Sequence, residues 1–338
     1  MRNETREKYN AYCEQVAKLN GVPSAAVKFS ATPSVQQTLE TKIQESSEFL
    51  RKINMFGVTE MKGEKLGLGV GSTIASNTDT SAGDRQTQDP TSVDAKGYEC
   101  RKNNYDTHLR YGTLDMWAKF PDFQTRVRNA IVHRQALDRI MIGFNGTSYA
   151  ADSDRVTNPL LQDVNIGWLQ KYRADAPARV MDEVVAASGA VNVFAGGDYE
   201  NLDALVFDAV NNLIDVWFRE DTALVAIMGR DLLADKYFPL INQAQPASEM
   251  LATDVVLSQK RVGGLPAARV PFLPAGTMLI TTFDNLSLYY QDGARRRHIL
   301  DNPKRDRIEN YESSNDDYVV EDYGRGCLIE NIVTVDPA

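Results

Sequence analysis

The chain has 338 residues, 43% of them hydrophobic and 25% charged, and a formal net charge of −9 at pH 7. These values provide a core for one large domain or two modest ones, and the acidic balance argues against nonspecific wrapping of DNA by the whole surface. No run of eighteen apolar residues is present, so no membrane span is expected.

The N-terminal stretch "MRNETREKYNAYCEQ" lacks the apolar region of a secretory signal. Three widely spaced cysteines, Cys13, Cys100 and Cys327, indicate free thiols in a reducing compartment.

Residues 1–30 carry about +2, against about −11 for the remainder, which suggests a separate partner for this segment. The spacing of its apolar residues predicts a helix that ends before Gly21 and Pro23. The expected stripe consists of Tyr9, Tyr12, Val16 and Leu19. It either packs on the chain's own body or docks on an assembly partner.

The segment "KFSATPSVQQ" predicts an exposed linker at 29–32, where proteases cut, followed by a second helix that continues to about Ile53. Ser34 and Gln37 have the spacing of a capping box. The helical stripe is Val35, Leu39, Ile43 and Leu50.

The glycine-rich string "GLGVGST" at 67–73 resembles a phosphate-binding loop only superficially. It lacks the Lys that such a loop requires, and no helix pattern follows it. Leu66, Leu68 and Val70 alternate with small residues, which favours a strand. The glycines between them would allow another segment of backbone to approach closely.

From Gly71 to Asn104 the chain is polar and almost free of large apolar residues, and strand patterns resume at about Tyr105 in "YDTHLRYGTLDMWAKF". A loop of this length is out of keeping with a compact domain. The flanking strands predict a long two-stranded arm, which needs another molecule to rest on because an isolated hairpin is marginally stable.

Residues 121–144 predict the strongest helix, with Pro121 in its first turn and Asn145-Gly146 after its end. Its apolar stripe consists of Phe123, Val127, Ala130, Ile131, Leu137, Met141 and Phe144. Its basic residues, Arg126, Arg128, His133, Arg134 and Arg139, are expected largely away from that stripe.

Residues 147–200 read as irregular. A small α/β lobe is expected at about 200–275, with a helix from Leu202 to Trp217, a buried strand in "TALVAIMG" and a helix in "RDLLADKYFPLIN". The strands "TMLITTF" and "LSLYYQ" have hairpin-like spacing, and the C-terminal region returns to strand patterns.

No catalytic or metal-binding motif is apparent. His108, His133 and His298 lack companions at ligand spacing, and the acidic cluster near Asp316 reads as a solvated face. The densest basic spot is Arg295, Arg296 and Arg297. It reads either as an exposed strand end balanced by nearby acids or as an intersubunit ion-pair site. No cofactor and no metal are expected, and a structural or assembly role is favoured.

Long strings then suggest a family: "PSVQQTLETKIQESSEFL", "RYGTLDMWAKFPDFQTRVRNAI", "GWLQKYRADAPARVM" and "RIENYESSNDDYVVEDYGRGCL". Across nearly its whole length the chain resembles the major capsid proteins of P2-like tailed bacteriophages. The resemblance implies the α+β Hong Kong 97-type capsid fold. Its expected parts are an N-terminal arm (1–53), an extended β-hairpin loop (54–110), a peripheral domain (111–199) with a spine helix (121–144), an axial domain (200–275) and a return to both domains (276–338).

The resemblance also implies hexamers and pentamers that form an icosahedral head around double-stranded DNA, assembled in the bacterial cytoplasm. The implied partners are a scaffolding protein, a prohead protease that removes about residues 1–29 near Phe29 and Ser30, and a portal protein. The extended loop would touch other subunits through Gly71, Ile74, Asp79, Arg85 and Asp89.

Two alternatives stay open at this point. One is a soluble enzyme with an unrecognised nucleotide or metal site in residues 200–275. The other is a related non-viral shell resembling an encapsulin.

Overall fold

The computed structural model describes residues 1–65, 75–87, 94–118, 120, 122–234, 236 and 260–335. The chain forms two compact units, each assembled from three separate segments. Unit 1 comprises Met1–Met61, Glu99–Gln170 and Leu286–Val319, and unit 2 comprises Lys62–Tyr98, Lys171–Asn285 and Val320–Ala338. No helix within the described parts of the chain has the length and hydropathy needed to span a bilayer.

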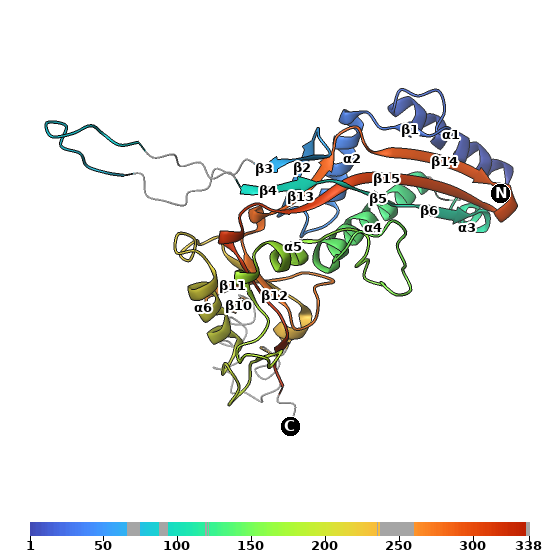
Figure 1. The fold of residues 1–338 in the computed structure, drawn as a ribbon. Coiled ribbons are helices and arrows are strands. Elements are labelled where there is room, and N and C mark those ends of the chain that lie inside the picture. The colour runs from blue at the N-terminus through green and yellow to red at the C-terminus, as the bar shows by residue number, and fades with distance from the viewer. Residues whose placement is uncertain are drawn as a thin grey trace, which may run out of the picture. The chain divides into compact units, whose positions relative to one another are not determined.

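Unit 1 is built around a sheet whose central element, β15 (Arg307–Val320), is a long strand (Figure 1). The order is β1-β14-β15-β13-β2, and β5 and β6 also pair with β15. The other strands are β1 (Phe29–Ser30), β2 (Asn54–Val58), β5 (Arg101–Asn104), β6 (Thr107–Arg110), β13 (Leu286–Gln291) and β14 (Arg296–Asn302). β14 and β15 form an antiparallel hairpin, whose turn contains a short 3₁₀ helix (Pro303–Arg305) and Asp306 in the left-handed region.

The helices of unit 1 are α1 (Asn3–Leu19), α2 (Pro33–Glu45), α3 (Tyr111–Trp117) and α4 (Phe123–Asn145), with α2 and α4 in contact. The core beneath α4 is aromatic. The ring centroid of Phe144 lies 5.4 Å from that of Phe49 and 5.3 Å from that of Trp168. The Trp168 centroid lies 6.0 Å from that of Phe49 and 5.2 Å from that of Tyr318. Trp168 belongs to α5 (Trp168–Asp175) and packs against Gly143 of α4, where a Cβ would overlap the indole.

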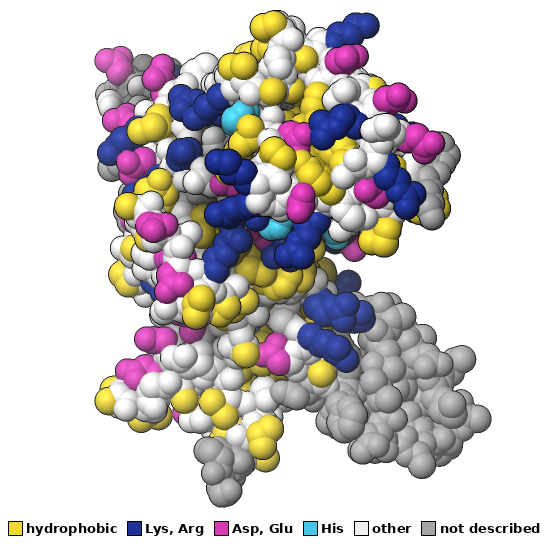
Figure 2. Space-filling model, turned by 90° about the vertical axis from the view of Figure 1, so that its right-hand side faces the viewer, with side chains coloured by type: hydrophobic (Ala, Val, Ile, Leu, Met, Phe, Trp, Pro, Cys, Tyr) yellow, Lys and Arg dark blue, Asp and Glu magenta, His cyan; other side chains and the backbone are white. Residues whose placement is uncertain are grey.

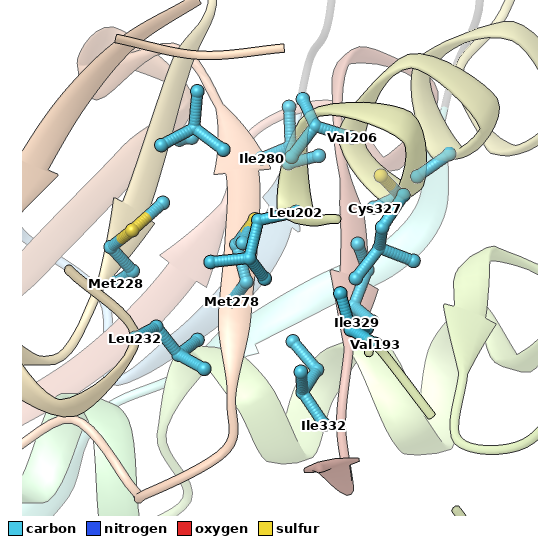
Figure 3. Packing of buried hydrophobic residues seen from close by; sticks show 14 of the residues in the cluster. Val193, Leu202, Val206, Met228, Leu232, Met278, Ile280, Cys327, Ile329 and Ile332 are labelled. Atoms are coloured by element: carbon cyan, nitrogen blue, oxygen red, sulfur yellow. The ribbon is translucent and has the colours of Figure 1, made fainter. Parts of the chain in front are cut away.

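Unit 2 has a mixed sheet in the order β10-β11-β9-β12-β16-β7. Its strands are β10 (Arg261–Val262), β11 (Leu265–Arg269), β9 (Val225–Met228), β12 (Met278–Thr281), β16 (Cys327–Ile329) and β7 (Val180–Met181). The helix α6 (Leu202–Leu213) covers it through Leu202, Leu205 and Val206, which lie in one apolar cluster with Met228, Met278 and Ile280 (Figure 3).

Two small sheets complete unit 2. β8 (Val191–Asn192) pairs in parallel with β17 (Ile332–Val333), and β3 (Lys62–Lys65) pairs with β4 (Asp94–Glu99). Short 3₁₀ helices lie at Pro177–Arg179, Phe283–Asn285 and Tyr323–Arg325.

Several local expectations are wrong. The second helix ends at Glu45 rather than near Ile53, and it begins at Pro33 with Thr32 as an extended N-cap, so Ser34 lies inside the first turn and forms no capping box. "YGTLDMW" is helical (α3) rather than extended. Residues 168–175 form α5 within a stretch that reads as irregular.

The hairpin expected from "TMLITTF" and "LSLYYQ" is also wrong. β12 pairs with β9 and β16, whereas β13 lies in the other sheet, beside β15 and β2. Both strands are nearly fully buried, so tertiary partners on each side decide their pairing, and a short spacer is insufficient evidence for a hairpin.

Candidate assembly surfaces

The first helix packs on its own chain. Tyr9, Tyr12 and Val16 of α1 contact a cluster that contains Ile299 of β14 and Ile308 of β15. Polar contacts hold its edge: Arg6 pairs with Asp301 at 3.1 Å, and the Tyr12 hydroxyl accepts a bond from Arg297 at 2.8 Å. Leu19, expected on the buried stripe, is 64% exposed and is the last residue of the helix.

The expected cleavage position is exposed in part, at Ser30 and Thr32, but it includes a strand and a buried Phe29. Phe29 and Ser30 form β1, which pairs antiparallel with the edge of β14, and Phe29 is buried in the same apolar cluster as α1. Ser30 is exposed, but its hydroxyl donates to the Gly293 carbonyl at 2.6 Å. A protease that binds an extended substrate would have to detach β1 from β14 first.

Five charged side chains form a buried network where α2, α4, β14 and β15 meet. Glu40 of α2 accepts from Arg139 of α4 and from Arg295, which precedes β14, the latter at 2.5 Å. Arg295 also contacts Glu312 at 2.7 Å, and Arg139 contacts Asp316 at 3.1 Å. Each of the five side chains is at most 5% exposed.

Hydrogen bonds complete this network. Gln135 donates to Glu312 at 3.0 Å and accepts from Arg295 at 2.8 Å. Burial alone would raise the pKa of Glu312, but the guanidinium groups of Arg295 and Arg297 outweigh it and hold that pKa below its usual range. Buried charges of this kind are tolerated only when paired, so the network fixes how these four elements meet.

The network corrects three sequence-based expectations. Arg139 is fully buried rather than on the solvated face of the long helix, and Asp316 is not solvated. Arg295 is 1% exposed and paired within its own chain, so it has no charge to offer another subunit. Of the three consecutive arginines, Arg296 is exposed, and Arg297 is bonded to Asn310 and Tyr12.

The stripe predicted for α2 consists of apolar residues and does not include Glu40. The buried residues are Gln36, Glu40 and Ile43, which share one face of the helix. Polar residues at this spacing carry no signal of burial in the sequence, since Gln37 and Thr41 have it too and are exposed.

In chain order, the polar stretch that begins at Gly71 follows β3 and leads to β4. Every described side chain in residues 75–87 is exposed, Asp79 and Arg85 included. Among the described residues, the bonds of this segment join Asp79 to Ser81, Ala82 and Gly83, and those from Ser81 lower the Asp79 pKa. Gly71, Ile74 and Asp89 lie outside the described residues, as does the glycine-rich string at 67–73.

Within the described part of the chain, no three His, Cys, Asp or Glu side chains gather as metal ligands would. The model of the family "Phage major capsid protein, P2 family" matches residues 8–332. The chain belongs to this family.

This P2-family capsid protein has relatives of nearly the same length. It is 58% identical over 340 residues to the capsid protein of Escherichia phage P2, covering 98% of this chain and 95% of that one. It is 44% identical over 344 residues to the major capsid protein of Serratia phage KSP20, covering 100% and 99%.

Solved structures of capsid chains also match this chain. A chain of the satellite phage P4 procapsid with size determination (Sid) protein matches with TM-score 0.84 at 55% identity, covering 100% of both chains. A capsid chain of an empty GTA particle matches with TM-score 0.50 at 17% identity, covering 85% and 90%, which bears on the fold alone. The chain is thus a major capsid protein with the α+β phage capsid fold, and its relatives are structural proteins rather than enzymes.

Proposed function

We propose that the chain forms hexamers and pentamers, and that these close into an icosahedral head around phage double-stranded DNA. The supporting observation is the family match over residues 8–332, together with a full-length structural match to a procapsid chain. In this proposal unit 1 supplies most of the peripheral domain, with α4 as its spine, and unit 2 supplies the axial domain and the extended loop.

The extended loop would lie on a neighbouring subunit. The described side chains of this polar segment are all exposed, so they form few stabilising contacts within their own subunit. They are therefore available to contact a second copy of the chain. The contact residues we propose are Asp79 and Arg85, together with Gly71, Ile74 and Asp89. Such contacts are heterologous and close into rings. Arg296 and Arg297 remain the candidates for an intersubunit ion pair.

Maturation would remove residues 1–29 by cleavage next to Phe29 and Ser30. The cut requires β1 to leave β14, and loss of the segment would uncover Ile299 and Ile308. The proposed partners are a scaffolding protein, the prohead protease and a portal protein, and assembly takes place in the host cytoplasm. Contacts with DNA would be independent of base sequence, through scattered Arg and Lys side chains.

Electron microscopy of the purified chain and its intact mass test this proposal. We expect closed particles or rings of five and six, and a mass loss equal to residues 1–29 after exposure to the protease. A small fixed oligomer that never forms rings would refute the shell, and an intact chain in mature particles would refute the trimming.

A further inference from the structure

An open apolar groove lies in unit 1, next to the surface on which α1 packs. It has a volume of about 350 Å³, and its walls come from β6, α3 and α4. The apolar lining among the described residues is Leu109, Leu114, Trp117, Val127, Ala130 and Ile131. Leu109, Leu114, Val127 and Ile131 also line the smaller cavity, about 60 Å³, under Tyr9 and Tyr12 of α1. The helix α1 thus covers one end of a longer apolar surface, and the other end is open.

The open end exposes large side chains. Trp117 is 41% exposed, and the centroid of its ring lies 6.4 Å from that of Phe120, which is 49% exposed. Met116, on the same helix as Trp117, is 63% exposed. Of these three side chains, Trp117 lines the groove, and Phe120 lies beside it. Large exposed apolar surfaces rimmed by polar residues are typical of interaction sites.

The rim of the groove carries two arginines, each paired with an aspartate. Arg126 and Arg134 line it, and their side chains are 55% and 57% exposed. Figure 2 looks onto the end of unit 1 that carries α1 and α3, where apolar side chains are interspersed with Lys and Arg and with Asp and Glu. The two arginines pair along α4 with Asp122 and Asp138 at 2.6 Å. The Arg126–Asp122 pair is exposed on both sides and therefore weak, so an incoming carboxylate can compete for the Arg126 guanidinium. In the Arg134–Asp138 pair the carboxylate is 23% exposed and the guanidinium remains open to solvent.

We propose that this groove binds an amphipathic helix of a partner protein, with the apolar face of that helix on Trp117 and Ala130 and its carboxylates beside Arg126 and Arg134. The neighbouring end of the same surface already holds a helix, α1, through side chains on one face. The proposal deepens the proposed function, since it gives the chemistry of an assembly partner.

Two segments of the chain itself fit poorly. Residues 75–87 contain no apolar side chain larger than alanine and cannot fill an apolar groove. A second copy of α1 would bring Arg6 and Lys8 toward Arg126 and Arg134, because these cations border the face that α1 buries. Like charges at this distance oppose binding.

The test uses the unassembled full-length chain and two labelled synthetic helices of about 20 residues, a length at which helices form in water. Both carry leucines along one face. One has glutamates along its edges and the other has lysines. We expect fluorescence anisotropy to show at least about tenfold tighter binding of the glutamate helix, a difference of about 1.4 kcal/mol. Equal affinity for the two helices, or no binding, would overturn the proposal.

Matched variants locate the site. Ala130→Glu places a carboxylate in the open groove and should weaken binding of the glutamate helix about tenfold or more. Asn129→Glu makes the same charge change at an exposed neighbour that does not line the groove, and should have no effect. Equal effects of the two would overturn the proposal. The double variant Arg126→Glu/Arg134→Glu changes only exposed side chains and should reverse the preference, so that the lysine helix binds more tightly. This variant tests the role of charge even if Ala130→Glu does not fold.

Self-association is read separately. If Ala130→Glu abolishes concentration-dependent association of the chain while neither synthetic helix binds, a second copy occupies the groove and the proposal is wrong. Shell formation by the chain without any added helix is scored by electron microscopy. Failure of the proposed shell therefore does not count against helix binding.

Discussion

Replacing Arg295 by methionine tests whether the buried network holds unit 1 together. Arg295 donates to Glu40, Gln135 and Glu312 and is 1% exposed. Its removal leaves Glu312 with only 5% exposure and without the guanidinium that contacts it. Breaking a buried ion pair in this way costs about 3–5 kcal/mol. For a unit of this size, that corresponds to a fall in Tm of roughly 6–20 °C.

The assay is urea or thermal unfolding of unassembled subunits, followed by tryptophan fluorescence. Trp168 is fully buried in unit 1, whereas Trp117 and Trp217 are 41% and 55% exposed, so the change in emission on unfolding reports mainly on unit 1. The control is Arg296→Met, the exposed neighbour, which should change stability by no more than about 0.5 kcal/mol. Arg295→Met/Glu312→Leu should recover much of the loss, because the unpaired carboxylate is then gone. If Arg295→Met costs no more than Arg296→Met, the assignment of a stabilising network is refuted.

Three further predictions concern acid, the arm and helix packing. The depressed Glu312 pKa means that the unfolded chain binds more protons, so its stabilisation is complete above the unfolded pKa of about 4.3 and is lost as pH falls through the folded value. Glu312→Gln should therefore flatten the acid limb of Tm against pH, and an unchanged limb would contradict this. Deleting residues 75–87 should leave Tm within about 2 °C, because these side chains are all exposed. It should abolish closed shells in electron micrographs if the extended loop contacts other subunits as proposed; normal shells would contradict that role of the loop. Gly143→Ala should cost about 1–3 kcal/mol by calorimetry, since its Cβ would overlap Trp168. The matched Gly112→Ala in α3, where a Cβ meets nothing within 4 Å, should not be destabilising.

The family match carries most of the functional conclusion, and the long uncommon strings in the sequence already indicated it. Elements with strong local signals were also readable from the residues. Helical spacing predicted α1, α4 and α6, and an uninterrupted apolar run predicted the buried strand β9. The periodicity of side chains along one segment indicates the type of element. It does not settle the buried face, because Leu19 of α1 and Ala130 of α4 are exposed, whereas Arg139 of α4 is fully buried.

Other features depend on residues far apart in the chain. Arg295, Arg296 and Arg297 look alike in sequence, and only the approach of Glu40 and Glu312 decides which one is buried. Likewise, β12 and β13 follow each other closely but join different sheets, because each pairs with strands from distant segments. Side-chain spacing fixes the local elements, whereas burial of charge and strand pairing are properties of contacts between segments, which only the tertiary structure brings together.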